Sequence, residues 1–163
     1  MENIRVAIWG FGAMGSGIAR MLLKKKGVEI IGVCDRNKAR VNKSMFDLLG
    51  GQRGDRKEVI INENIEEVLL EGSCDVCLCA TDSYTKNAFP RLKLVLEKKV
   101  NVISTAEEMA YPKVQNPELA KELDRIAKEN GVTVLGTGIN PGLIMDLLVV
   151  TLPPCMADVE PVE

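Results

Sequence analysis

The sequence predicts an α/β fold built on a doubly wound parallel sheet. Three observations predict it. A glycine-rich turn separates an apolar run from a helix-like segment, an acidic residue lies about twenty positions beyond that turn, and strand and helix patterns alternate along the chain. With 163 residues, the chain is long enough for one domain with a sizeable hydrophobic core.

The glycine-rich turn has the spacing G-x-G-x-x-G and directly follows the apolar run at residues 4–9. In such a turn the first glycine lets the chain leave a strand tightly, the second lets a pyrophosphate approach the backbone, and the third lets helix and strand pack closely. The phosphates then lie at a helix N-terminus, where free N–H groups favour anions. We therefore predict a Rossmann-type NAD(P) site with contacts from Gly10, Phe11, Gly12, Ala13, Met14 and Gly15.

The acidic residue that should contact the adenine ribose is Asp35, at the end of the second apolar run, residues 28–34. Its carboxylate can accept hydrogen bonds from both ribose hydroxyls of NAD, and it would repel the 2′-phosphate of NADP. Arg36 follows directly, and its guanidinium could pair with that phosphate. These two residues predict dual specificity with NAD slightly favoured. The alternative is that Asp35 only starts a turn and Arg36 is a solvated surface charge.

Short apolar runs alternate with helix-like segments along the rest of the chain. Most of these runs are aliphatic throughout, which is typical of parallel strands buried on both faces. Parallel strands joined by right-handed helical crossovers give a doubly wound sheet. The predicted strands are residues 4–9, 28–34, 58–61, 75–80, 101–104 and 132–135, and the predicted helices are residues 12–25, 38–49, 65–70, 84–98 and 117–129.

Composition excludes several classes of protein. The formal net charge is −2 and no long basic run could follow a phosphate backbone, so we expect no nucleic acid partner. No signal peptide pattern or membrane-spanning apolar segment is present, so we expect a cytoplasmic protein that does not bind membranes. The odd number of cysteines, five, favours reduced thiols, and the absence of histidine argues against a mixed metal site, so we expect no metal.

Loops that follow the first, fourth, fifth and sixth strands should meet at the cofactor crevice. After the fourth strand, Ala80 and Thr81 are small and suited to contact the nicotinamide ribose, although the polar residues beyond them could instead only cap a helix. After the fifth strand, Thr105 is a predicted cofactor contact. Glu107 and Glu108 could bind a cationic substrate or act as acid and base, or could simply be solvated.

The glycine-rich loop at residues 136–142 follows the sixth strand and precedes an apolar run at residues 143–152. Glycine supplies the unusual backbone angles of such a loop, and Pro141 supplies a rigid exit. Since the loop should face the same crevice as the glycine turn, we predict that it shapes the nicotinamide and substrate pocket. Asn140 and Pro141 are its predicted cofactor contacts. A plain tight turn is the alternative.

Three stretches together resemble a known family: residues 6–15, residues 101–108, and residues 136–142 with Met145 and Asp146 beyond them. They resemble the N-terminal domain of the 2,4-diaminopentanoate dehydrogenases, which belong with the dihydrodipicolinate reductase-like and diaminopimelate dehydrogenase-like amino acid dehydrogenases. The resemblance runs through nearly the whole chain to about Leu152. It implies an NAD(P)-dependent oxidoreductase that acts on a CH–NH2 group, with a small amino acid as substrate and oxidative deamination of a diamino acid such as 2,4-diaminopentanoate as reaction.

The resemblance also implies a division into domains, because these enzymes carry a second α+β domain that supplies much of the substrate pocket and the dimer contact. We expect residues 1–152 to form the cofactor domain and residues 153–163 to be a tail that starts the absent domain. The full-length form is then a homodimer, and this chain alone is inactive. Glu108 and Asp146 are the predicted catalytic groups. The alternatives are an imine reductase of the dihydrodipicolinate reductase type and a non-catalytic nucleotide-sensing module.

Overall fold

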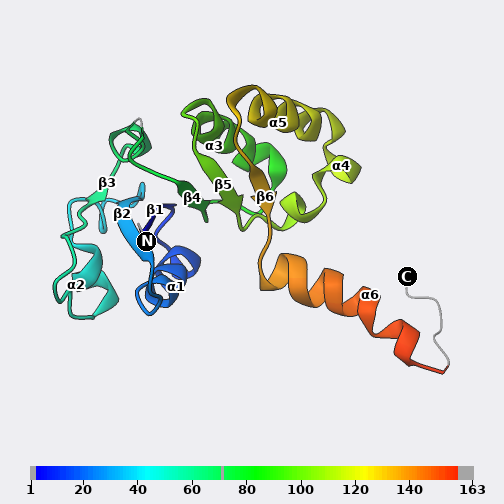
Figure 1. The fold of residues 1–163 in the computed structure, drawn as a ribbon, viewed down its shortest axis with the longest axis horizontal. Helices are drawn as coiled ribbons and strands as arrows, with labels where there is room; N and C mark the ends of the chain where they lie inside the picture. The colour runs from blue at the N-terminus through cyan, green and yellow to red at the C-terminus, as the bar shows by residue number, and fades with distance from the viewer. Residues whose placement is uncertain (1–2, 71, 158–163) are drawn as a thin grey trace.

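The computed structural model describes residues 3–70 and 72–157 of the chain (Figure 1). Within these residues, six strands form a single sheet in the order β3-β2-β1-β4-β5-β6, and every neighbouring pair is parallel. This is the strand order of the dinucleotide-binding doubly wound fold, so the predicted fold class is confirmed. The strands are β1 Ile4–Trp9, β2 Val28–Cys34, β3 Ile61–Asn62, β4 Val76–Cys79, β5 Asn101–Ser104 and β6 Val134–Gly136.

Helices cover both faces of the sheet, with α1 and α2 on one side and α3 and α5 on the other (Figure 1). Side chains of β1 alternate between the two layers, because successive residues of a strand point to opposite faces. Val6 and Ile8 pack in the core beneath α1, whereas Ala7 belongs to the core beneath α3 and α5. The helices are α1 Ala13–Leu22, α2 Met45–Leu49, α3 Thr85–Glu97, α4 Pro112–Gln115, α5 Pro117–Asn130 and α6 Val149–Thr151, with shorter or wider turns at η1 Ile65–Glu67, η2 Glu107–Ala110, η3 Ile139–Leu148 and η4 Pro153–Cys155.

The bounds of α5 follow from its sequence. Pro117 begins the helix, where a missing N–H costs nothing, and Gly131 ends it with a left-handed φ of 67°. Between them, buried residues recur every three or four positions and face α3 and the sheet. The buried positions are Ala120, Leu123, Ile126 and Ala127.

Two predicted helices are wrong in extent. The helix predicted at residues 38–49 is confined to α2, because Asn42 has a left-handed φ of 63° and Ser44 then caps a new helix by accepting from the backbone N–H groups of Phe46 and Asp47. The helix predicted at residues 65–70 shortens to the single turn η1. The segment between β2 and β3 is therefore largely turns, and this places different side chains near the end of β2.

The predicted strand at residues 58–61 is also displaced. Ser44 and Ile60 form an antiparallel bridge, and the N–H groups of Met45 and Ile61 donate to the carbonyl groups of Val59 and Lys43. The segment before β3 thus pairs first with the chain ahead of α2. Only Ile61–Asn62 pairs with β2 and forms β3.

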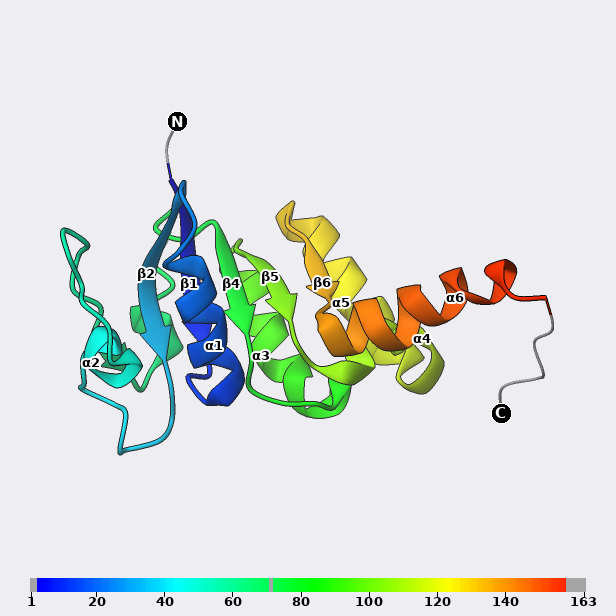
Figure 2. The same ribbon diagram turned by 90° about the horizontal axis from the view of Figure 1, so that it is seen from below.

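The predicted loop at residues 136–142 is only partly a loop, because a helix begins at Ile139. The turns of η3 run on into α6, and Figure 2 shows this continuous helix extending away from the body of the domain. Large apolar side chains of the run at residues 143–152 are exposed on it; Val150, for example, is 74 % exposed. Within the described residues, no helix is both long enough and apolar enough to cross a membrane.

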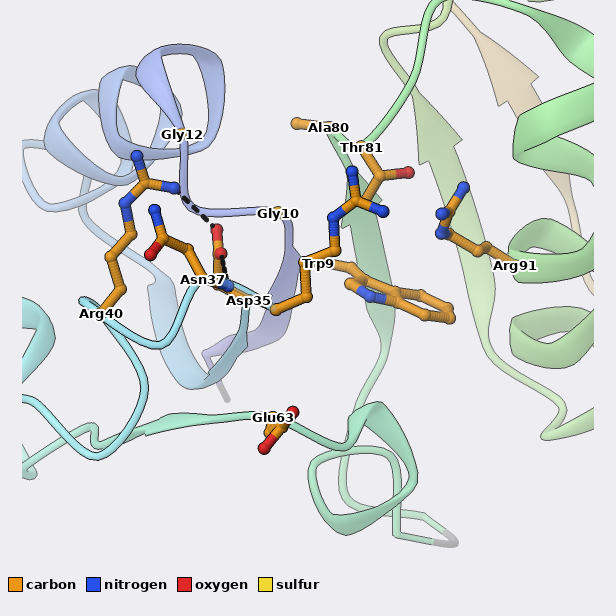
Figure 3. Close-up of a pocket in the computed structure, with 11 residues that line it drawn as sticks. Trp9, Gly10, Gly12, Asp35, Asn37, Arg40, Glu63, Ala80, Thr81 and Arg91 are labelled. Atoms are coloured by element: carbon orange, nitrogen blue, oxygen red, sulfur yellow. Dashed lines mark hydrogen bonds and ion pairs between the residues drawn. The ribbon is translucent and has the colours of Figure 1, made fainter.

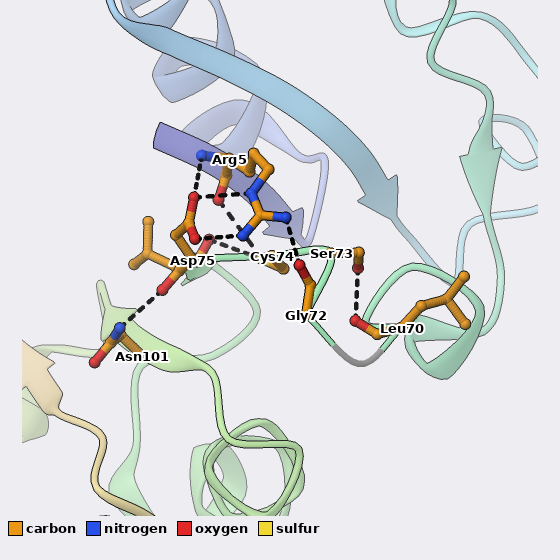
Figure 4. Close-up of polar contacts among 8 residues, drawn as sticks. Arg5, Leu70, Gly72, Ser73, Cys74, Asp75 and Asn101 are labelled. Atoms are coloured by element: carbon orange, nitrogen blue, oxygen red, sulfur yellow. Dashed lines mark hydrogen bonds and ion pairs between the residues drawn. The ribbon is translucent and has the colours of Figure 1, made fainter. Parts of the chain in front are cut away.

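A polar cluster joins the amino ends of the central strands, opposite the predicted cofactor edge (Figure 4). Arg5 on β1 forms two side-chain hydrogen bonds to the Asp75 carboxylate, at 2.7 and 3.1 Å, and also donates to the carbonyl of Gly72. The Asn101 amide donates to the carbonyl of Asp75 and accepts from the backbone N–H of Thr133. The cluster links β1, β4, β5 and the segment that leads into β6.

The Asp75 carboxylate should make this end of the sheet sensitive to acid. Hydrogen bonds from Arg5 hold the pKa of Asp75 at about 2, below its ordinary value of 3.8. Because the folded-state pKa is depressed, the stabilisation is complete above pH 3.8 and is lost as the pH falls toward about 2. We expect Asp75→Asn to unfold at lower urea than the wild type at pH 7, with the difference shrinking below pH 4.

The matched control is Asp124→Asn, which removes an exposed i,i+4 ion pair with Lys128 on α5. Exposed pairs of that kind contribute little, so its urea midpoint should stay close to that of the wild type. A difference between Asp75→Asn and the wild type that does not change with pH would contradict the assignment.

Candidate functional site

A pocket of about 460 Å³ lies at the carboxyl edge of the sheet, across the ends of β1, β2 and β4 (Figure 3). Ligands of doubly wound sheets bind in this position, where the strand order reverses. The pocket combines the predicted glycine turn, the predicted acidic residue and the loop after β4. Its lining residues are Trp9, Gly10, Gly12, Asp35, Arg36, Asn37, Arg40, Glu63, Ala80, Thr81 and Arg91.

The three glycines of the turn differ in what a side chain would meet. Gly10 has a φ of +94°, and a Cβ there would lie 2.5 Å from the carbonyl oxygen of Ala80. A Cβ on Gly15 would lie 1.8 Å from the carbonyl oxygen of Gly10. A Cβ on Gly12 would meet nothing within 4 Å. The first and third glycines are therefore required by the fold, whereas the second keeps open the space beside the backbone.

The N-terminus of α1 opens onto that space. Gly12 is its N-cap, no side chain caps it, and its first turn carries no acidic residue. The unpaired N–H groups of a helix start attract anions, and the helix dipole adds to that attraction. The open side of Gly12 together with the uncapped α1 fits the pyrophosphate of a dinucleotide.

Asp35 lies at the end of β2 and is 6 % exposed. Its Oδ2 accepts from the backbone N–H of Phe11 at 2.6 Å and from Arg40 Nη1 at 3.2 Å, and its Oδ1 accepts from the backbone N–H of Asn37 at 2.7 Å. The first of these bonds ties the glycine turn to β2. Since an ionised carboxylate offers about four acceptor positions, one remains for a ligand hydroxyl.

Charged groups surround the pocket beyond Asp35. Arg36 and Arg40 come from the segment after β2, and Arg91 comes from α3, where it donates to the carbonyl of Asn87. Glu63 lies apart from Arg40 and Arg91 in Figure 3 and forms an ion pair with Lys38 at 2.6 Å. Three guanidinium groups at one pocket favour an anionic ligand.

Trp9 lines the pocket, and the two thiols beside it in the sheet are buried and unreactive. Trp9 ends β1 and lies between Cys34 of β2 and Cys79 of β4 in the strand register. Burial raises the pKa of the Cys34 thiol to about 12, with nearby carboxylates adding to the effect, and burial also raises the pKa of Cys79. Both thiols therefore stay protonated at neutral pH and pack as small apolar groups.

The structure brings only some of the predicted site residues together. Gly10, Gly12, Asp35, Arg36, Ala80 and Thr81 line the pocket, and Phe11, Ala13, Met14 and Gly15 complete the turn and the start of α1. Thr105, Glu108, Asn140 and Asp146 do not line it. Asn140 and Asp146 lie on η3, where Asp146 Oδ2 accepts from the N–H of Gly142 at 2.6 Å. Pro141 is also within η3, and its side chain lies outside the described part of the structure.

Glu108 lies in a second, polar pocket of about 360 Å³ near the start of α3. Its Oε2 accepts from the backbone N–H of Thr85 at 2.8 Å and from the Asn116 amide at 3.2 Å. The carboxylate thus caps α3 from a distant part of the chain, and it is half-buried. Tyr84 and Lys86 are among the other residues that line this pocket.

Sequence reasoning missed four charged or polar residues of the main pocket: Asn37, Arg40, Glu63 and Arg91. Asn37 and Arg40 reach the pocket because the chain forms turns after β2 instead of the predicted helix. The only available signal was their closeness to Asp35 in the sequence. Arg91 is one polar residue on an amphipathic helix, and nothing in its spacing distinguishes it from a solvated one.

Comparison with known proteins agrees with this geometry. The chain is 58 % identical over 159 residues to the 2,4-diaminopentanoate dehydrogenase of Acetoanaerobium sticklandii, covering 98 % of this chain and 44 % of that protein. The structure of an amine dehydrogenase from Mycobacterium smegmatis superposes with a TM-score of 0.83 at 35 % identity, over 97 % of this chain and 46 % of the other. The chain thus spans a little under half the length of these two relatives.

More distant structures share the fold alone. A homoserine dehydrogenase from S. aureus superposes with a TM-score of 0.61 at 19 % identity, over 83 % of this chain and 33 % of the other. The family description that matches this chain is the saccharopine dehydrogenase NADP binding domain, over residues 6–135. That range contains the glycine turn, Asp35 and every residue that lines the main pocket. The chain therefore belongs to the saccharopine dehydrogenase NADP-binding domain family.

Proposed function

We propose that this chain is the cofactor-binding part of an NAD(P)-dependent amine dehydrogenase that oxidatively deaminates a diamino acid such as 2,4-diaminopentanoate. The observation that carries the proposal is the open, uncapped start of α1 beside Gly12, joined to Asp35 in one pocket. The 58 % identity to a 2,4-diaminopentanoate dehydrogenase supports the substrate class. The bound nicotinamide supplies the hydride acceptor, and the chain supplies binding and orientation.

The cofactor contacts follow from the pocket. The N–H groups at the start of α1 hold the pyrophosphate, and Asp35 accepts from a ribose hydroxyl at its remaining acceptor position. Ala80 and Thr81 line the side toward β4. Thr105, Asn140 and Pro141 remain proposed contacts on the nicotinamide side. Both NAD and NADP are accepted.

Glu108 is the group we propose for the reacting amine. Its carboxylate follows the carboxyl end of β5, as catalytic groups of doubly wound enzymes do, and it already accepts two hydrogen bonds that fix its position. A positioned carboxylate can accept hydrogen bonds from a substrate ammonium and take its proton. Asp146, which is exposed on η3, is the second proposed acid–base group.

The exposed helix formed by η3 and α6 supports a larger assembly. Large apolar patches on a soluble domain are usually covered by another domain or subunit. We propose that residues 1–152 form the cofactor domain, that residues 153–163 lead into a substrate domain, and that the complete protein is a homodimer. All five cysteines are free thiols, which supports a cytoplasmic location.

Binding of reduced cofactor can be followed through Trp9, the single tryptophan of the chain. Because Trp9 lines the pocket next to Gly10, we expect NADH and NADPH each to quench its fluorescence saturably. The two dissociation constants should agree within about tenfold, or roughly 1.4 kcal/mol. Titration of the folded chain measures both constants, and unchanged fluorescence at millimolar cofactor would contradict the proposed function.

Substitutions of Gly12 and Gly15 should separate the contribution of the turn to folding from its contribution to binding. Gly15→Ala forces a methyl group onto the backbone of Gly10, and we expect it to lower the free energy of unfolding by about 1–3 kcal/mol or more. Gly12→Ala meets open space and has an ordinary φ of −75°, so its thermal midpoint should stay close to the wild type. Its methyl group lies where the phosphates pass, and NADH binding should weaken at least tenfold, roughly 1.4 kcal/mol.

Thermal unfolding and cofactor titration of both variants check this prediction. A Gly12→Ala variant that binds NADH like the wild type would contradict a phosphate site at this position. Gly15→Ala serves as the matched substitution, since it adds the same methyl group to the same turn.

The proposed acid–base role needs a protein with a substrate domain. Residues 1–163 can be joined to the remaining part of the 58 % identical relative. We expect this chimera to oxidise 2,4-diaminopentanoate in preference to other amino acids. Glu108→Gln should lower kcat by roughly 100-fold or more and leave NADH binding unchanged, because general acid–base groups contribute factors of that size.

The control is Glu107→Gln, which neutralises the adjacent exposed carboxylate. Thermal unfolding shows whether the loss of a capping carboxylate destabilises α3. Full activity of a folded Glu108→Gln chimera would rule out the assigned role.

A further inference from the structure

We propose that Arg40, by cancelling the charge of Asp35, is the residue that lets this site accept the 2′-phosphate of NADP. The inference rests on the proposed cofactor function and deepens it. It assigns cofactor choice to a residue that the sequence did not single out. The choice between NAD and NADP then depends on Arg40 more than on Arg36, the arginine that directly follows Asp35.

Backbone hydrogen bonds hold the carboxylate of Asp35 in the pocket. Its carboxylate accepts from the backbone N–H groups of Phe11 and Asn37 at 2.6 and 2.7 Å, and its side chain is 7 % exposed. Both donors belong to the backbone of the two turns that form the pocket, so the carboxylate is fixed by the fold. A dianionic 2′-phosphate on the adenine ribose would come close to this fixed charge, because the same ribose is the ligand of Asp35.

Arg40 is the cation that meets this charge. Its Nη1 lies 3.2 Å from Asp35 Oδ2, and its side chain is 35 % exposed, so water screens the pair only in part. The contact engages one of the five N–H donors of the guanidinium. The group also lines the pocket (Figure 3), so it can pair with Asp35 and face an incoming phosphate at the same time.

Arg36 is placed differently. It is exposed, and within residues 3–70 and 72–157 its side chain makes no hydrogen bond or ion pair. A guanidinium that is not held in place must lose rotamer freedom to bind a phosphate, and it does not offset the charge of Asp35. Arg36 can therefore add to NADP binding, but the buried carboxylate would still oppose it.

A purely structural role for Arg40 predicts a different outcome. If Arg40 only held Asp35 in position, its loss would weaken the ribose contact of NADH and NADPH alike. If Arg40 cancels the charge of Asp35, its loss weakens only ligands that carry a 2′-phosphate. The ratio of the two affinities therefore distinguishes the roles.

The experiment measures the binding of NADH, NADPH, 5′-ADP and 2′,5′-ADP to the chain by calorimetry. We expect Arg40→Gln to weaken NADPH and 2′,5′-ADP at least about tenfold, and to change NADH and 5′-ADP by less than about threefold. Arg36→Gln should weaken NADPH less than Arg40→Gln does. Lys43→Gln removes the same charge from an exposed neighbour that does not line the pocket, and it is the matched control.

The double variant Asp35→Asn with Arg40→Gln tests the cause directly. Removing the carboxylate charge should restore NADPH binding relative to Arg40→Gln alone, because no charge remains to be cancelled. Arg40→Lys, which keeps the charge, should retain most NADPH binding and covers the case in which Arg40→Gln fails to fold.

Three outcomes would overturn the inference. These are equal losses for NADH and NADPH in Arg40→Gln, a larger NADPH loss in Arg36→Gln, and no recovery in the double variant. Failure of the wild type to bind either dinucleotide would overturn the proposed function as well. If the wild type binds NADH normally and Arg40→Gln leaves the ratio of NADPH to NADH affinity unchanged, this inference alone is overturned.

Discussion

The site depends on how closely three backbone segments approach one another where β1 meets α1. A Cβ at Gly10 would lie 2.5 Å from the carbonyl oxygen of Ala80, and one at Gly15 would lie 1.8 Å from that of Gly10. Glycine at both positions brings the end of β4, the turn and α1 into contact. The start of α1 then has a single direction, toward the carboxyl edge of the sheet, and its unpaired N–H groups face the pocket. Gly12 lies between these contacts and keeps the approach open.

Asp35 joins this turn to the neighbouring strand. Its carboxylate accepts from the Phe11 N–H, so β2 and the glycine turn share a buried charge. A buried charge is costly unless partners surround it, and here backbone N–H groups and Arg40 provide them. The arrangement that orders the pocket therefore also sets its electrostatic preference. Structure and ligand choice are linked through one side chain.

The sequence predicted what depends on local pattern and missed what depends on the path of the chain. Strands β1, β2 and β5 have the predicted bounds, because buried parallel strands are continuous apolar runs. The position of Asp35 followed from motif spacing. Arg40 was missed because Asn42 adopts a left-handed conformation and ends the predicted helix, which no apolar periodicity reveals. The extent of the loop at residues 136–142 was also mispredicted, since a helix begins at Ile139 and includes Asn140, which does not line the main pocket.

The two edges of the sheet have different roles: the amino edge holds the strands together, and the carboxyl edge forms the pocket. At the amino edge, the Arg5–Asp75 ion pair and the hydrogen bonds of Asn101 to the backbone of Asp75 and Thr133 connect neighbouring strands. At the carboxyl edge, strand ends are held by glycine contacts and by Asp35, and donors and acceptors remain for a ligand. In a parallel sheet the amino ends of the strands lie at one edge and the carboxyl ends at the other. A polar network at the amino edge can therefore hold the strands in register without occupying the pocket at the carboxyl edge. The register of β1 against β2 and β4 then places Trp9, which lines the pocket, between the buried residues Cys34 and Cys79.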